Sequence, residues 1–162
     1  MSRIAVITGA AGDMGQALCQ ALSATDWRVV GVDVRPPADV IADVCDAPRL
    51  AQLAAELGAE LKLWVNAAGI LGAGKPGQID LDTWQRVLAV NLTGTYGGCE
   101  AAFPVMKASG GGRIVNVGSL AGQIGGAPGM HPAYGASKAG VHALTKTYAQ
   151  AGARHNIHCN AV

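Results

Sequence analysis

The chain has 162 residues, of which 50% are hydrophobic and 14% are charged, and its formal net charge is +1. This balance excludes an intrinsically disordered chain. It also argues against a nucleic-acid-binding protein, which needs a cationic excess to neutralise phosphates. No apolar run approaches the roughly 20 residues that span a bilayer, and the first residues lack the architecture of a signal peptide, so we expect a cytoplasmic protein. The length predicts one domain, residues 1–162.

Apolar runs alternate with helical patterns along the whole chain. Strands are predicted over residues 4–8, 28–32, 40–42, 61–65, 113–117 and 157–162. Helices are predicted over residues 14–25, 48–57, 81–107 and 133–154, with Pro104 kinking the third of them. Such alternation is typical of a parallel sheet covered on both faces, joined by right-handed crossovers. We therefore predict a doubly wound, three-layer α/β/α fold, whose ligands bind beyond the carboxyl ends of the strands.

The four cysteines, Cys19, Cys45, Cys99 and Cys159, are scattered and form no CxxC pair. This distribution predicts buried or half-buried thiols rather than a disulfide framework. His155 and His158 lie near Cys159, which could suggest metal ligands. A motif without its structural context is weak evidence, so no metal site is predicted.

A glycine-rich segment, residues 8–15, follows the first predicted strand and opens a helix. Backbone N–H groups at a helix N-terminus, unobstructed by Cβ atoms, can cradle a pyrophosphate. A turn that needs glycine only to begin a helix is the alternative. The position between a strand and a helix favours a dinucleotide site. Its predicted residues are Gly9, Gly12, Asp13, Met14 and Gly15.

Asp33 ends the second predicted strand. A carboxylate there can accept both ribose hydroxyls of the adenosine and would repel a 2′-phosphate, so NAD is favoured over NADP. Arg35 is a counter-argument, because a nearby arginine can hold a 2′-phosphate, and a solvated turn aspartate is the alternative role. Asp43 and Val44 follow the third strand and are expected at the adenine edge, or in a plain loop.

Tyr134 and Lys138 share one helix face, one turn apart. A neighbouring ammonium lowers the pKa of a tyrosine, and a poised phenolate can take a proton from an alcohol or return it to a carbonyl. Ser119 follows a strand and could bind the reacting oxygen, and Asn91 could hold a water beside Lys138. Each also has an ordinary explanation: a chance pair, a loop serine, or an asparagine that caps a local distortion. Their shared place at one end of the sheet favours the functional interpretation.

These residues resemble those of the short-chain dehydrogenase/reductase family over essentially the whole chain. The glycine segment resembles the family's cofactor loop. Asn66, Ala67, Ala68 and Gly69 resemble the segment after its fourth strand, which stabilises the sheet beside the cofactor. Asn91, Ser119, Tyr134 and Lys138 resemble its catalytic tetrad.

The resemblance implies a Rossmann fold and hydride transfer between a nicotinamide cofactor and a secondary alcohol or ketone. It implies Tyr134 as general acid/base and Lys138 as the group that lowers its pKa and holds the nicotinamide ribose. Ser119 would orient the substrate oxygen and Asn91 would maintain a relay water. The same resemblance implies a homodimer or homotetramer, formed through the helices that carry Asn91 and Tyr134.

Three departures from the family pattern stand out. Asp13 replaces a usual glycine, and the spacing of Gly9, Gly12 and Gly15 resembles that of the longer, sugar-nucleotide-modifying members. Residues 35–39 leave no room for a crossover helix, which predicts a short third strand. The sequence also stops at Val162, where the family continues, so the fold is expected to lack its last helix and strand.

Two alternatives to a dehydrogenase follow from these departures. The first is an NAD-binding protein without turnover, because much of the family's substrate region lies after the position of Val162. The second is a sugar-nucleotide epimerase or dehydratase, which is disfavoured because such enzymes need a sizeable C-terminal substrate domain.

Overall fold

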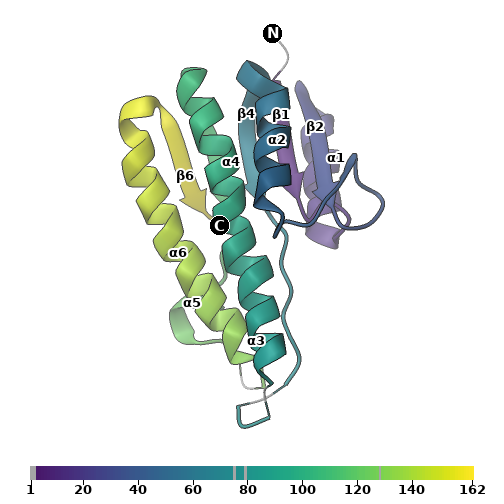
Figure 1. Cartoon of the computed structure of the whole chain (residues 1–162), viewed down its shortest axis with the longest axis vertical. Coiled ribbons are helices and arrows are strands. Elements are labelled where there is room, and N and C mark those ends of the chain that lie inside the picture. The colour runs from purple at the N-terminus through teal and green to yellow at the C-terminus, as the bar shows by residue number, and fades with distance from the viewer. Residues whose placement is uncertain (1–2, 75, 79, 128) are drawn as a thin grey trace.

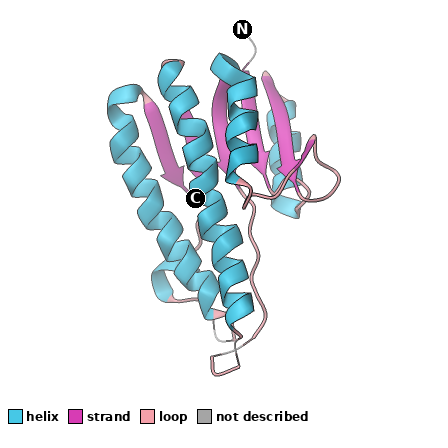
Figure 2. Ribbon diagram, in the orientation of Figure 1, coloured by secondary structure: helices cyan, strands magenta, loops and turns pink. Residues whose placement is uncertain are grey.

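The centre of the molecule is a six-stranded sheet in which every neighbouring pair of strands is parallel (Figure 1, Figure 2). The computed structural model describes residues 3–74, 76–78, 80–127 and 129–162. The strands are β1 (Arg3–Thr8), β2 (Trp27–Asp33), β3 (Val40–Ile41), β4 (Leu61–Asn66), β5 (Gly112–Asn116) and β6 (Ile157–Ala161). Their order is β3-β2-β1-β4-β5-β6. The strand order reverses between β1 and β4, where open α/β sheets bind their ligands.

Helices cover both faces of the sheet, which confirms the predicted doubly wound fold (Figure 1). One face carries α2, α4 and α6, and α1 lies on the opposite face beside β1 and β2 (Figure 1). The helices are α1 (Asp13–Ser23), α2 (Ala47–Leu57), α3 (Leu81–Leu88), α4 (Gly94–Ala108), α5 (Ala121–Ile124) and α6 (Pro132–Gly152). Two short 3₁₀ turns, η1 (Gly58–Glu60) and η3 (Ala153–His155), follow α2 and α6. Among the described residues, every helix is too short or too polar to cross a membrane.

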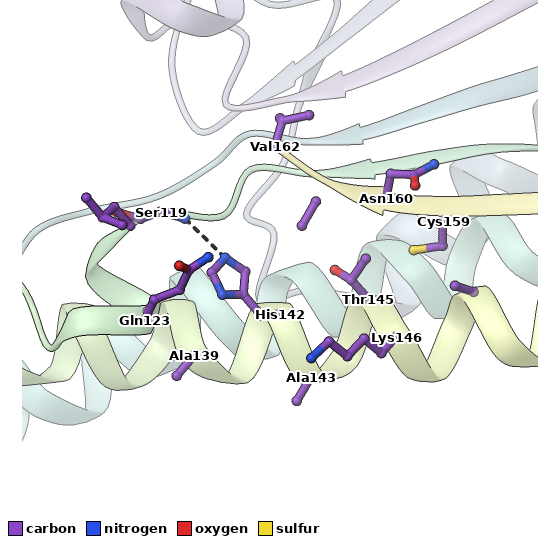
Figure 3. Close-up of a pocket in the computed structure, with 14 residues that line it drawn as sticks. Ser119, Gln123, Ala139, His142, Ala143, Thr145, Lys146, Cys159, Asn160 and Val162 are labelled. Atoms are coloured by element: carbon purple, nitrogen blue, oxygen red, sulfur yellow. Dashed lines mark hydrogen bonds between the residues drawn. The ribbon is translucent and has the colours of Figure 1, made fainter.

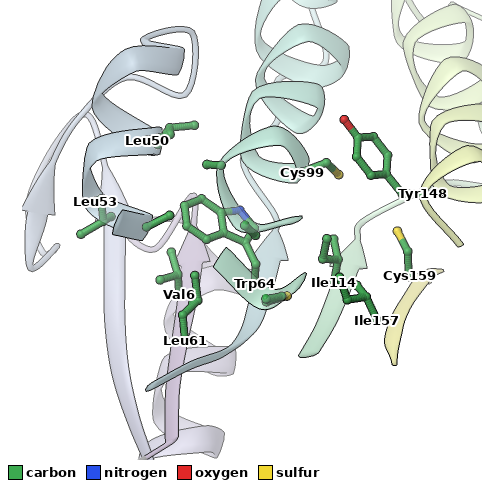
Figure 4. Close-up of a cluster of buried hydrophobic side chains, with 14 of the residues drawn as sticks. Val6, Leu50, Leu53, Leu61, Trp64, Cys99, Ile114, Tyr148, Ile157 and Cys159 are labelled. Atoms are coloured by element: carbon green, nitrogen blue, oxygen red, sulfur yellow. The ribbon is translucent and has the colours of Figure 1, made fainter. Parts of the chain in front are cut away.

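The main core lies between the sheet and the helices α2, α4 and α6 (Figure 4). Val6, Trp64, Ile114 and Cys159 occupy paired positions on four adjacent strands and form one row across the sheet. Each is at most 4% exposed. Because successive side chains of a strand alternate between faces, slipping a strand by one residue would turn its member of this row to the other face of the sheet. The row therefore fixes the register that brings the strand ends together.

The prediction of one continuous helix over residues 81–107 is wrong, because the helix is interrupted. The helix α3 ends at Leu88, a π-helical turn η2 (Ala89–Thr93) follows, and α4 begins at Gly94. The extra residue of a π turn shifts the helix face that follows it, and such turns are frequent at functional sites. A second difference is α5, a short helix between β5 and α6, where the sequence predicted no helix.

The predicted short third strand is confirmed, since β3 spans only Val40–Ile41 and follows β2 after a short link. Asp39 closes this link, because its Oδ2 accepts a hydrogen bond from Gly31 N–H at 2.7 Å. The cysteines also follow the prediction with one exception. Cys99 and Cys159 are buried and Cys19 is half-buried, whereas Cys45 is exposed.

Candidate active site

The glycine segment packs the start of α1 directly against two other stretches of backbone. Gly9 has φ +72°, and a Cβ there would lie 2.7 Å from Ala68 Cα. A Cβ at Gly15 would lie 2.0 Å from the carbonyl oxygen of Gly9. Only glycine at these positions allows the turn to close this tightly. The helix begins after Gly12, which provides no side-chain cap, so the first-turn N–H groups are left for an external acceptor.

Asp13 and Met14 form the exposed first turn of α1. An acidic side chain in this position is favoured by the helix dipole. Because Asp13 is exposed, water screens the charge of its carboxylate.

Asp33 is anchored between the glycine segment and its own turn. Its Oδ2 accepts a hydrogen bond from Ala11 N–H at 3.0 Å, and its Oδ1 accepts one from Arg35 N–H at 3.2 Å. The half-buried carboxylate lines a cavity of about 650 Å³ at the carboxyl ends of β1, β2 and β4. Most of the predicted cofactor residues line this cavity: Gly9, Gly12, Asp33, Asp43, Val44, Ala67, Ala68 and Gly69.

Asp43 and Val44 have different environments within that cavity. Asp43 is exposed, and its Oδ1 accepts a hydrogen bond from Cys45 N–H at 2.9 Å. Val44 is only 7% exposed and packs against α4, where a Cβ on Gly94 would lie 2.6 Å from Val44 Cγ2. Val44 thus joins the loop after β3 to the helix that follows the π turn.

The segment after β4 is tied to β1 by Thr8, which the sequence analysis placed in the glycine segment but did not single out as a site residue. Thr8 Oγ1 accepts hydrogen bonds from Ala67 N–H at 3.2 Å and from Ala68 N–H at 3.3 Å. Its place as the last residue of β1, just before the glycines, was the available signal. The bond fixes the backbone of residues 67 and 68 beside the glycine cradle.

Asn66 is not among the described residues that line the cavity, and neither are Asp13, Met14, Gly15, Tyr134 and Lys138. Asn66 is 3% exposed, and its Oδ1 accepts a hydrogen bond from Trp64 Nε1 at 2.9 Å. Its Nδ2 donates to Asn116 Oδ1 at 2.9 Å, and Asn116 in turn donates to Thr145 Oγ1 at 2.9 Å. The side chain of Asn66 thus links β4 through β5 to α6 beneath the site.

Lys138 is a buried cation next to Tyr134 on α6. It is 4% exposed, its Nζ lies 5.8 Å from the centroid of the Tyr134 ring, and Nζ donates a hydrogen bond to Val117 O at 2.6 Å. Burial lowers the pKa of the Lys138 ammonium from its ordinary value. The helix α6 starts just before this pair, with Pro132 in its first turn and His131 Nδ1 accepting from Ala133 N–H at 3.1 Å.

Asn91 lies in the π turn and is fully buried. Its Oδ1 accepts a hydrogen bond from Ile70 N–H at 2.8 Å, and its Nδ2 donates to Ile70 O at 2.9 Å and to Ser137 Oγ at 3.1 Å. The local distortion that the sequence left open as an alternative is therefore present, and Asn91 is its polar centre. Ser137 is a contact that the sequence analysis missed, although a serine on the buried face of a helix was a usable signal.

Ser119 lies three residues after β5, at the start of the turn that leads into α5. Its Oγ accepts a hydrogen bond from Ala121 N–H at 3.1 Å, and the residue is half-buried. The helix α5 packs closely on α6, since a Cβ on Gly122 would lie 2.6 Å from the carbonyl carbon of Lys138. The loop of Ser119 is thereby held beside the turn of α6 that carries Tyr134 and Lys138.

Comparison with known proteins agrees with this architecture. The family model of the short chain dehydrogenases matches residues 37–162. Galactitol 2-dehydrogenase (L-tagatose-forming) of Cereibacter sphaeroides is 33% identical over 98% of this chain and 68% of its own length. Trans-4-hydroxycyclohexanecarboxylate dehydrogenase of Sinomonas cyclohexanicum is 36% identical over 99% of this chain and 70% of its own length.

Solved structures show the same likeness. A protein of Beutenbergia cavernae described as an NAD(P)-dependent gluconate 5-dehydrogenase, with NADP bound at low occupancy, is 30% identical and has a TM-score of 0.88. The comparison covers 98% of this chain and 70% of that one. The chain therefore belongs to the short-chain dehydrogenase/reductase family of NAD(P)-binding oxidoreductases.

Proposed function

We propose that this protein is an NAD-dependent oxidoreductase that interconverts a secondary alcohol and a ketone, with Tyr134 as the general acid/base. The observation that carries this proposal is the buried ammonium of Lys138, 5.8 Å from the Tyr134 ring. A cation in a site of low dielectric stabilises a phenolate more than it would in water. Tyr134 then takes the proton from the alcohol in one direction and returns it to the ketone in the other.

The glycine cradle fits a dinucleotide. The capless start of α1 and the absence of a Cβ at Gly12 leave backbone N–H groups facing outward, which suits a pyrophosphate. In this proposal Gly9, Gly12, Asp13, Met14 and Gly15 hold that pyrophosphate. The nicotinamide of the bound cofactor supplies or accepts the hydride.

The remaining cofactor contacts follow from the cavity. Asp33 binds the adenosine ribose, and Asp43 and Val44 border the adenine. Ala67, Ala68 and Gly69 line the cavity toward Lys138, which holds the nicotinamide ribose. Asn66 supports this segment from below, through its bonds to Trp64 and Asn116.

The preference for NAD over NADP rests on the carboxylate of Asp33. It lines the cavity and is held in place by two backbone N–H groups, so a 2′-phosphate would approach a fixed negative charge. Arg35 also lines the cavity and is exposed, and its guanidinium is the one feature of this loop that would favour NADP. We propose NAD rather than NADP because the carboxylate of Asp33 is anchored by hydrogen bonds and the sheet fixes its position at the end of β2.

Ser119 and Asn91 complete the proposed catalytic set. The hydroxyl of Ser119 binds the substrate oxygen, and Asn91 maintains a proton relay from Lys138. The relatives support a secondary alcohol as substrate, since their names specify galactitol, D-threitol and 4-hydroxycyclohexanecarboxylate. We further propose one domain over residues 1–162, a cytoplasmic location, and a homodimer or homotetramer formed through α4 and α6.

A second candidate function is cofactor binding without turnover. The described lining of the 650 Å³ cavity includes Asp33 and Gly69 but neither Ser119 nor Tyr134. The cavity therefore gathers predicted cofactor residues, whereas Ser119 lines a separate groove. This candidate predicts affinity for NAD and no oxidation of any secondary alcohol.

The deciding experiment measures both binding and turnover for the wild type and for Tyr134→Phe. NAD must raise the midpoint of thermal unfolding. At an NAD concentration a hundred times the dissociation constant, binding adds about 2.7 kcal/mol to the free energy of unfolding. We expect NADH formation with a polyol such as galactitol, and its loss in Tyr134→Phe with the NAD affinity unchanged. Binding without turnover in the wild type would select the second candidate. Turnover that survives in Tyr134→Phe would refute the role of Tyr134.

A further inference from the structure

Two side chains of α6, one turn apart, hold the loop that carries Ser119. Lys138 Nζ donates to Val117 O at 2.6 Å. His142 Nε2 accepts a hydrogen bond from Ser119 N–H at 3.5 Å (Figure 3). Residues at positions i and i+4 project from the same side of a helix, so both side chains reach the same loop. Lys138 already has a role in the proposed acid/base pair, whereas the proposed function assigns no role to His142.

The backbone next to Ser119 is shaped to admit the imidazole. A Cβ on Gly118 would lie 2.5 Å from His142 Nε2 and 3.0 Å from its Cδ2. Any other residue at position 118 would push the ring away from the loop. Gly118 N–H also donates to Val162 O at 2.7 Å, which fixes the loop to the end of β6. The close approach of the ring to Gly118 thus accompanies its hydrogen bond to Ser119.

We propose that His142 is a positioning residue for Ser119. Its neutral imidazole, with the proton on Nδ1 and the lone pair of Nε2 toward Ser119 N–H, fixes the backbone from which the hydroxyl projects. Ser119 Oγ accepts from Ala121 N–H at 3.1 Å, which occupies an acceptor site of the hydroxyl and not its proton. His142 therefore helps to aim that proton at a substrate oxygen, and this inference rests on the proposed function of Ser119.

Protonation of His142 would remove the acceptor. A proton on Nε2 would face the N–H of Ser119, so the bond could not form. The half-buried ring lines a groove of about 940 Å³, so a proton can reach it (Figure 3). The charged neighbours on α6 are Lys138 and Lys146, one turn before and one turn after. The side chains that α5 and β6 present to the same groove include Gln123, Asn160 and the thiol of Cys159, and Val162 follows β6.

Nuclear magnetic resonance on the ¹⁵N-labelled chain tests the geometry without any need for turnover. We expect the neutral ring of His142 to carry its proton on Nδ1. On acidification the amide signals of Gly118 and Ser119 should shift in step with the His142 ring, and this coupled shift should vanish in His142→Leu. His158→Leu, at an exposed histidine of β6, should retain it. A neutral ring protonated on Nε2, or a Ser119 amide that ignores the titration, would overturn the proposal.

Kinetics with NAD and a secondary alcohol test the consequence. We expect His142→Leu to lower kcat about ten- to a hundredfold, as small misplacements of catalytic groups do, with the NAD affinity within about twofold of wild type. His142→Gln, whose carboxamide oxygen can accept the same bond, should recover part of the loss. An unchanged kcat in His142→Leu would overturn the proposal. A wild type without turnover would instead count against the proposed function, and the resonance experiment would still decide the position of His142.

Discussion

The carboxamide of Asn91 pairs with the backbone of Ile70 as a neighbouring strand would. Oδ1 accepts from Ile70 N–H at 2.8 Å while Nδ2 donates to Ile70 O at 2.9 Å. A loop residue that has no strand beside it thereby has both backbone groups satisfied inside the protein. Asn91 reaches Ile70 from the π turn and bonds Ser137 of α6 as well. One side chain therefore joins the segment after β4 to the helix of Tyr134.

Removing this carboxamide should destabilise the fold. Asn91→Ala leaves Ile70 with two part-buried backbone groups unpaired and also creates a small cavity. We expect the free energy of unfolding to fall by about 2–4 kcal/mol. Urea denaturation measures the change. Asn160→Ala, at an exposed position of β6, is the matched control and should change stability by less than about 0.5 kcal/mol. Equal effects of the two substitutions would contradict the structural role of Asn91.

The sequence predicted the sheet well because its strands are short apolar runs bounded by glycine and polar residues, such as residues 4–8. It also marked the residues after those strands, including Asp33 and Ser119, because an α/β sheet brings its carboxyl ends to one edge. Both predictions use periodicity and chain order, which are local properties of the sequence.

The π turn and the contacts of Ile70 and His142 were not predictable in the same way. A π turn depends on which side chains must face the site after the helix resumes, and Val90-Asn91-Leu92 has no local pattern that separates it from an α-helix. Ile70 acts through its backbone, which leaves no trace in residue type. His142 lies on an ordinary amphipathic stretch, and its partner Ser119 is 23 residues away in sequence.

Two glycines of the glycine segment, residues 8–15, should respond differently to an added methyl group. A Cβ at Gly15 would lie 2.0 Å from Gly9 O, whereas one at Gly12 would meet the same atom at 3.3 Å. Gly15→Ala should therefore cost about 3 kcal/mol of folding stability or prevent folding, because backbone atoms cannot yield. Gly12→Ala should stay folded, with a stability loss below about 1 kcal/mol, and should weaken NAD binding by obstructing the cradle.

Thermal denaturation and calorimetric NAD titration separate the two effects. Each variant is the control for the other, since both add one methyl group at the start of α1. A Gly15→Ala protein as stable as the wild type would show that the segment does not close as described. A Gly12→Ala protein with full NAD affinity would place the pyrophosphate elsewhere.

Neutralising Asp33 should shift the cofactor preference. Asp33→Asn keeps an oxygen that can accept from Ala11 N–H but loses the charge that, in the proposed function, binds two ribose hydroxyls and repels a 2′-phosphate. Hydrogen bonds to charged groups contribute about 1.5–3 kcal/mol, so NAD affinity should fall about tenfold or more. The ratio of NAD affinity to NADP affinity should fall further. Calorimetry with both cofactors measures this ratio. Asp80→Asn is the control, because Asp80 caps α3 and asparagine caps a helix as well as aspartate does. A ratio that is the same in Asp33→Asn and the wild type would assign the ribose to another residue.

Tyr148 should make the protein lose stability at alkaline pH. Its hydroxyl donates to Glu100 Oε1 on α4, and burial, followed by this hydrogen bond and the charge of Glu100, raises the pKa of Tyr148 above its ordinary 10.0. Above about pH 10 the unfolded chain releases this proton while the folded chain keeps it, so unfolding becomes more favourable as pH rises. One such proton changes the free energy of unfolding by about 1.4 kcal/mol per pH unit.

Urea denaturation between pH 8 and 11 should therefore show that the free energy of unfolding falls more steeply with pH in the wild type than in Tyr148→Phe. Tyr96→Phe, at a residue 48% exposed, should retain the wild-type slope. Parallel curves for the wild type and Tyr148→Phe would mean that the hydroxyl of Tyr148 titrates equally in both states.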